Sequence, residues 1–154
     1  MFCVRDSILI DAPIDRCFLL STSIELVGPI LGMRAVSGKT SGLAIDGDQL
    51  VWRGWKFGLP QMHETLITAY RRPEFFQDTM GRGRFEFFQH DHHFTEVDRR
   101  TLLGDEVRFA MPLGFAGRLV GRFVMLPHIR RLLRRRFAML KQIAEGPEWE
   151  RHLV

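Results

Sequence analysis

The sequence predicts an α+β domain in which a curved antiparallel β-sheet wraps around a long C-terminal helix, with two short helices after the first strand. The long helix is indicated by residues 114–145, where apolar side chains recur every three or four positions. The sheet is indicated by residues 34–111, where stretches rich in β-formers are separated by turn residues. A chain of 154 residues has the length of one ordinary domain, so we expect a single domain over 1–154.

Composition and charge narrow the class of protein. Thirteen Phe and three Trp accompany one Tyr, so the aromatic side chains are almost wholly apolar and suit a thick core or a lined cavity. The net charge of +4 arises mainly from arginines of the C-terminal helix, and we expect no nucleic-acid partner from such a local patch. Cys3 and Cys17 form no CxxC pair, which favours reduced thiols in the cytoplasm. We find neither a signal peptide nor a run of about twenty apolar residues, so we expect no membrane span.

The N-terminal third begins with one strand and two short helices. Residues 2–10 are rich in β-formers and predict the strand. Pro13 suits the first turn of the helix that follows. Residues 21–23 close this helix and can cap a second one over 24–27, which we expect the Gly28-Pro29 pair to end.

The middle of the chain reads as a meander of strands. The predicted strands are 34–40, 49–57, 62–70, 74–80, 84–96 and 101–111. We expect the last two to form a hairpin that turns at Asp98-Arg99. The aromatic residues of these strands are interpreted mainly as core, and those that point outward would suit a homodimer interface.

The C-terminal helix is amphipathic. Its predicted buried stripe is Leu119, Phe123, Leu126, Ile129, Leu133, Phe137, Leu140 and Ala144. The side chains that we place on a solvated face are Arg118, Arg122, Arg130, Arg131, Arg134, Arg135, Arg136 and Lys141. Pro127 predicts a kink or a break into a short and a longer helix, because proline lacks the N–H that continues the hydrogen-bond ladder. Gly146-Pro147 predicts the end of the helix.

Half of the six histidines lie within residues 90–93. Alternate residues of a strand share a face, so His90 and His92 point the same way as Phe88 and Phe94. Two aromatic rings on either side of two imidazoles are typical of a cavity wall. We therefore expect these side chains to face the interior of the sheet.

The hairpin turn sets the partners of these histidines. The expected pairs are Phe88 with Phe109, His90 with Val107, His92 with Asp105, and Phe94 with Leu103. Apolar residues then lie opposite apolar residues, and a carboxylate lies opposite an imidazole. A partly buried His92–Asp105 pair would raise the pKa of the imidazole. A slip of one residue would move the whole set to solvent.

Three interpretations of the histidine pair stay open. It is a satisfied polar pair in an aromatic wall, or a general acid/base group formed by His90, His92 and Asp105. Metal ligation would need a third ligand, for which His63 and Glu64 are the nearby candidates. Neither a nucleophile elbow nor a nucleotide-binding glycine motif is present. We assign no metal and no cofactor.

Several local motifs occur in an order that covers nearly all of the chain. They are Ala12-Pro13 with Phe18, Trp52-Arg53-Gly54 with Phe57-Gly58, Tyr70-Arg71-Arg72-Pro73 with Phe76-Gln77-Asp78, Gly83-Arg84-Phe85 with Phe88, His90, His92 and Phe94, and Thr101 and Asp105 with Pro112-Leu113-Gly114. In these motifs and in its order of elements the chain resembles the START-like, or SRPBCC, superfamily. The best-known shape of that superfamily is the major birch-pollen allergen. The local motifs resemble its bacterial polyketide cyclase or dehydrase-like branch.

The resemblance implies a helix-grip fold with a hydrophobic cavity between the sheet and the C-terminal helix. We expect the cavity to bind an apolar or aromatic small molecule, lipid-like or polyketide-like. The residues expected to contact this ligand are Phe88, Phe94, Val107, Phe109, Phe123, Leu126, Leu133 and Phe137. One alternative is a cyclase or dehydratase-type enzyme that uses the His-Asp pair. Another is a module that docks on an anionic membrane or nucleic acid through the arginines of residues 130–136, beside Leu132 and Leu133.

Overall fold

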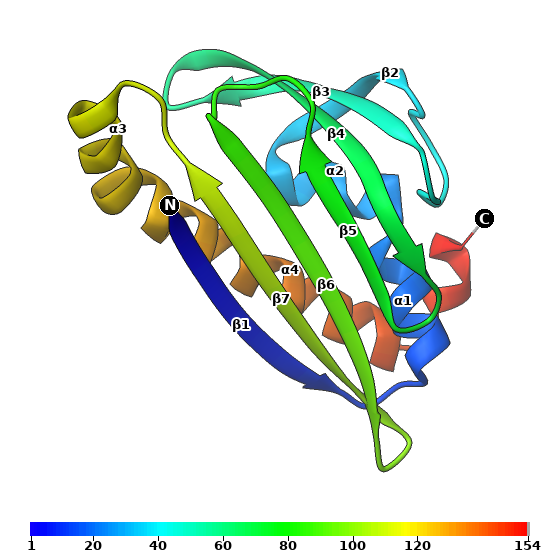
Figure 1. Ribbon diagram of the computed structural model, residues 1–154. Coiled ribbons are helices and arrows are strands. Elements are labelled where there is room, and N and C mark those ends of the chain that lie inside the picture. The colour runs from blue at the N-terminus through cyan, green and yellow to red at the C-terminus, as the bar shows by residue number, and fades with distance from the viewer. Residues whose placement is uncertain (154) are drawn as a thin grey trace.

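The computed structural model describes residues 1–153, in which seven antiparallel strands form one sheet around a long helix (Figure 1). The strands are β1 (Phe2–Ile10), β2 (Met33–Gly38), β3 (Gln49–Lys56), β4 (Leu59–Arg71), β5 (Phe75–Met80), β6 (Phe87–Val97) and β7 (Arg100–Ala110). The helical segments are α1 (Ile14–Ser21), α2 (Ile24–Leu31), α3 (Gly114–Val120), the π-helical turn η1 (Gly121–Met125), α4 (Leu126–Glu145) and the 3₁₀ turn η2 (Trp149–His152). The predicted α+β class is confirmed. The predicted domain extends to Val154, which lies outside the described residues.

The strand order is β1-β7-β6-β5-β4-β3-β2. Strands β2 to β7 form the predicted meander, and β1 adds to its far edge beside β7. Figure 1 shows α4 running along one face of the sheet, with α1 and α2 near its C-terminal half. Side chains on that face of the sheet therefore point either at a helix or into the space between the sheet and the helices.

The two short helices form where the sequence predicts them. Pro13 precedes α1 in an extended conformation, as expected for a helix entry. Helix α2 does not end at Gly28-Pro29 but continues to Leu31, and Gly32 closes it with a left-handed φ of 64°. Proline costs α2 one hydrogen bond, but the helix buries Ile24 against Trp52 of β3 in a separate core cluster. This packing outweighs the local helix-breaking signal.

The β6–β7 register is the predicted one. Phe88 lies opposite Phe109, His90 opposite Val107, His92 opposite Asp105, and Phe94 opposite Leu103. Asp98 and Arg99 form the turn with φ values of 49° and 65°. Two successive positive φ values match the right-handed twist of a hairpin, which explains why the turn holds this register.

The C-terminal helix is irregular next to Pro127, where the π turn η1 passes into α4, but the backbone stays helical on both sides of this boundary. The predicted end at Gly146 is confirmed. The C-terminal part of the predicted stripe is buried and consists of Ile129, Leu133, Phe137, Leu140 and Ala144.

The first part of the predicted stripe is wrong. Leu119 and Phe123 are 45% and 69% exposed. The π turn η1 holds more residues per turn than an α-helix, so it rotates the preceding residues relative to α4. Val120 and Val124 contribute to the wall between helix and sheet instead, although they are 42% and 40% exposed. Gly121 allows the turn to approach the sheet, because a Cβ there would stand 2.3 Å from the ring of Phe2.

The prediction for Arg136 is also wrong. Its charge predicts a place on the solvated face, yet the side chain is 7% exposed. Arg136 lies seven positions after Ile129 and four before Leu140, so helical spacing places it within the buried stripe. Arg134 and Arg135 are exposed as predicted.

The aromatic residues divide between core and surface. Trp52 and Phe76 are buried as expected, whereas Trp55 and Phe57 are 71% and 60% exposed at the tip of the β3–β4 hairpin. Among the described residues, no helix has both the length and the apolar character needed to cross a membrane.

Replacing Arg99 with Gly should stabilise the protein by about 0.5 kcal/mol. Glycine removes the strain of a left-handed residue, about 1–2 kcal/mol, and costs about 0.5–1 kcal/mol in unfolded-state entropy. Arg100→Gly is the control, because Arg100 lies in β7 and glycine there should destabilise by the entropic cost alone. Urea unfolding measures both variants, and equal destabilisation would contradict the turn assignment.

Candidate functional site

A cavity of about 480 Å³ lies between the sheet and helices α2 and α4. Most of its wall is apolar, and the wall includes Val27, Trp52, Phe85, Phe88, Val107 and Leu133. Strands β1 and β7 pack against α4 on one side of the cavity, and residues of β3 and β4 form the opposite wall. The volume lies within the range of small-molecule sites, about 300–1,000 Å³.

Three of the residues expected to contact a ligand line this cavity, namely Phe88, Val107 and Leu133. The wall also contains His90 and His92, as the alternation of β6 predicts. These five residues come from β6, β7 and α4. The structure thus brings the residues of β6 next to Leu133, which lies more than 40 positions later in the chain.

The other expected contacts lie outside the cavity wall. Phe94 and Phe137 are buried in the core cluster around Phe18 of α1, which fills the space beyond the end of the cavity. Phe109 stacks on Phe2 with ring centroids 5.1 Å apart. Leu126 packs against the core cluster that contains Phe109 and Ile129. Phe123 lies on the outer side of the π turn.

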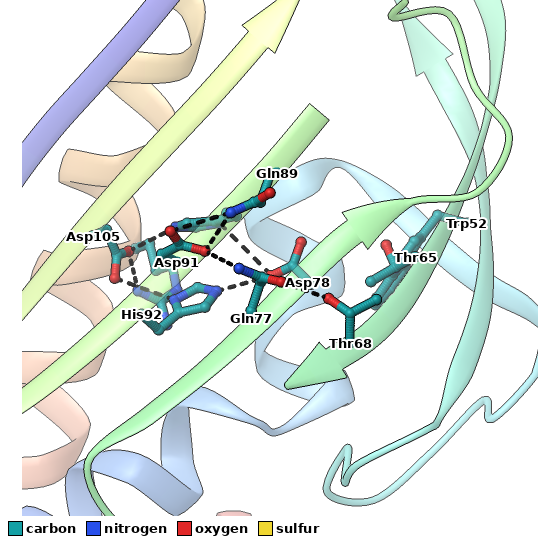
Figure 2. Close-up of polar contacts among 11 residues, drawn as sticks. Trp52, Thr65, Thr68, Gln77, Asp78, Gln89, Asp91, His92 and Asp105 are labelled. Carbon is teal, nitrogen blue, oxygen red and sulfur yellow. Dashed lines mark hydrogen bonds and ion pairs between the residues drawn. The ribbon is translucent and has the colours of Figure 1, made fainter. Parts of the chain in front are cut away.

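A polar cluster interrupts the apolar wall. Asp78 of β5, His92 of β6 and Asp105 of β7 lie side by side on neighbouring strands, as Figure 2 shows. Nδ1 of His92 is 3.2 Å from Oδ1 of Asp105, and Nε2 is 2.9 Å from Oδ2 of Asp78. The predicted His92–Asp105 pair is therefore present, but His92 also contacts a second carboxylate.

His90 lies directly beside this chain of contacts. Its ring centroid is 3.7 Å from that of His92, and its Nδ1 is 3.9 Å from Oδ2 of Asp78. Its Nε2 is 3.1 Å from Oδ2 of Asp105, although the N–H direction is poor for a hydrogen bond. Asp105 thus faces one nitrogen of each imidazole. Nη1 of Arg136 donates a hydrogen bond to the same Asp105 carboxylate from α4.

Burial and neighbouring charges shift the pKa values of the four titratable side chains of the cluster. Burial alone would raise the pKa of the Asp105 carboxyl, but the Arg136 guanidinium and both imidazoles hold this pKa well below its ordinary value. Burial would lower the pKa of His92, yet the two carboxylates raise it. Burial and the neighbouring His92 lower the pKa of His90. Burial would raise the pKa of Asp78, and the imidazoles lower it. These directions favour the cationic form of His92 and the neutral form of His90.

Sequence reasoning missed Asp78 and Arg136. Asp78 shares a strand face with Phe76, so alternation gives its side but leaves its partners open. The spacing of Arg136 within the apolar stripe was a signal for burial. The two residues considered as a third metal ligand lie elsewhere: His63 packs against Phe88 in the cavity wall, and Glu64 contacts Arg82 at 3.2 Å.

Replacing Arg136 with Met should destabilise the protein by about 3–5 kcal/mol, because it leaves the Asp105 charge buried without its guanidinium. Arg134→Met, an exposed change two residues earlier in the same helix, should alter the free energy of unfolding by about 0.5 kcal/mol or less. Urea unfolding compares the two. Similar values for both variants would show that the Arg136–Asp105 contact does not support the fold.

No protein-family model matches the sequence, and no curated protein matches it significantly. Solved structures do match. TTHA0849 from Thermus thermophilus is 14% identical with a TM-score of 0.67, covering 99% of this chain and 97% of its own. A START superfamily protein from Mycobacterium smegmatis is 13% identical with a TM-score of 0.63, covering 90% and 98%. Ara h 8.0201 is 12% identical with a TM-score of 0.56, covering 89% and 98%. At these identities the likeness concerns the fold alone, and it confirms the helix-grip fold that the sequence predicts.

Proposed function

We propose that this protein binds an apolar or aromatic small molecule, lipid-like or polyketide-like, between the sheet and α4. The observation that carries the proposal is the apolar cavity of about 480 Å³. Burying apolar ligand surface there contributes about 25 cal/mol per Å². The polar cluster at the wall would face one part of the ligand, which favours a molecule with an apolar body and a polar group.

The rim of the cavity supports ligand entry near the β3–β4 tip. Phe57 lies edge-on to the ring of His128 with centroids 5.2 Å apart, and it is 60% exposed. Val124 of η1 also lines the cavity and is 40% exposed. Apolar side chains that are half in water and half in the cavity wall are suited to admit an apolar molecule.

The other predictions from the sequence stay predictions. The catalytic roles of His90, His92 and Asp105, a homodimer and a cytoplasmic location are among them. The structure changes the surface that could dock on an anionic partner. Arg136 and the apolar Leu133 are buried. The exposed cations of this segment are Arg130, Arg131, Arg134 and Arg135. We favour cavity binding over docking because a built cavity accompanies it.

Binding of N-phenyl-1-naphthylamine, a neutral apolar fluorophore, tests the proposal. We expect saturable fluorescence enhancement in the wild type and a dissociation constant at least about tenfold weaker in Val124→Trp, because the indole would fill the rim. Phe123→Trp is the matched control: it introduces the same ring one residue away, outside the cavity, and should stay within about twofold. Equal binding by all three proteins would contradict the proposed site.

Salt distinguishes cavity binding from surface docking. Raising NaCl from about 50 to about 500 mM should change the fluorophore affinity by less than about twofold, because burial of a neutral apolar molecule is not screened. Binding to phosphate-rich vesicles through the exposed arginines would weaken steeply over that range. A vesicle affinity that exceeds the fluorophore affinity, and falls with salt, would favour docking instead.

A further inference from the structure

Asp78, His90 and His92 present their metal-type donor atoms to one another. One nitrogen or oxygen from each residue lies within 4.8 Å of the other two. The two histidines are alternate residues of β6, and Asp78 lies opposite His90 in the register with β5. The donors therefore come from adjacent strands of a sheet rather than from a loop, which keeps their spacing rigid.

The atoms that converge are Nδ1 of His90, Nε2 of His92 and Oδ2 of Asp78. Oδ2 is 3.9 Å from the first nitrogen and 2.9 Å from the second. Donors bound to a first-row metal at about 2.0–2.2 Å lie roughly 3–3.5 Å apart in a tetrahedron. The widest of these spacings exceeds that value, so the three side chains would have to rotate toward a bound ion.

The outward nitrogens of both imidazoles face one further carboxylate. Nδ1 of His92 is 3.2 Å, and Nε2 of His90 is 3.1 Å, from the two oxygens of Asp105. Metal-binding histidines commonly turn their second nitrogen toward a carboxylate, which fixes the ring orientation and makes the ligating nitrogen more basic. Here Asp105 contacts Nδ1 of His92 in this way and lies beside His90 without a well-directed hydrogen bond, and Arg136 holds the carboxylate in place.

We propose that Asp78, His90 and His92 form a site for a divalent transition-metal ion, such as Zn²⁺, at the polar wall of the cavity. Two imidazole nitrogens with one carboxylate oxygen suit Zn²⁺ and its first-row neighbours better than Mg²⁺ or Ca²⁺, which prefer oxygen ligands. Three protein ligands leave a coordination position free, and the adjoining cavity gives it access to water or to a ligand.

A metal ion at this site would replace a proton of the cluster. The ion would take the place of the proton shared between His92 and Asp78, so both histidines would bind it as neutral imidazoles. Two carboxylates and Arg136 would then surround a divalent ion, which leaves a net charge of about one that bound hydroxide could neutralise. The arrangement needs no further charged residue. It also stands apart from the proposed function, since it requires no organic ligand.

The test is calorimetric titration of Zn²⁺ into chelator-treated protein, without any organic ligand. We expect about one ion per chain with a dissociation constant near 1 μM or tighter. Asp78→Asn and His90→Gln should each weaken binding at least about tenfold, because each removes one ligand. Asp105→Asn should weaken it by about 10–100-fold, because it loosens the ring of His92.

Two histidine controls match these variants. His93→Gln changes the next residue of β6, which is exposed on the other face, and His63→Gln changes a cavity histidine outside the cluster. Both should bind Zn²⁺ within about twofold of the wild type. Thermal unfolding of every variant without metal separates loss of ligation from loss of folding. The proposal is overturned if folded wild type binds no Zn²⁺, if folded Asp78→Asn and His90→Gln bind as tightly as the wild type, or if the controls lose binding equally.

Fluorophore binding reports separately on the apolar part of the cavity. A wild type that binds N-phenyl-1-naphthylamine but no Zn²⁺ would overturn the metal site and leave the proposed function intact. Zn²⁺ binding without fluorophore binding would support the metal site and contradict the apolar ligand. The two proposals therefore fail independently.

Discussion

The contact between Arg136 and Asp105 is the constraint on which the interior depends. It joins α4 to the middle of the sheet, and both side chains are almost removed from water. An unpaired charge at this depth would cost several kcal/mol, so helix and sheet must keep this relative position. Asp105 in turn faces one nitrogen of each imidazole of β6. The same carboxylate thus contributes to the position of the helix, the charge balance of the cluster and the orientation of the His92 ring.

Local sequence patterns predict the part of the site that one hairpin contains. Alternation along residues 88–94 gives the inward face, and the turn residues Asp98 and Arg99 give the register. Together they place His92 against Asp105, 3.2 Å apart in the structure. The order of strands and the amphipathic C-terminal helix predict the helix-grip fold for the same reason: each depends on periodicity within one segment.

The parts that sequence reasoning missed depend on contacts between segments. Asp78 reaches His92 through the β5–β6 register, and the connection of residues 81–86 contains Gly81 and Gly83 but no two-residue turn that would define this register. Arg136 was assigned by its charge, although its spacing places it in the buried stripe. Phe123 was assigned by spacing, but a π turn changes the phase of a helix without a distinctive apolar pattern. In each case the tertiary contact overrides the local signal.

The central claim is that an open apolar cavity lies between the sheet and α4. X-ray diffraction from crystals held under xenon pressure tests it most directly, because xenon enters dry apolar cavities. We predict bound xenon among Trp52, Val107 and Leu133, which line the cavity. Side chains that close this space, with no xenon among these residues, would contradict the claim and with it the proposed binding of an apolar ligand.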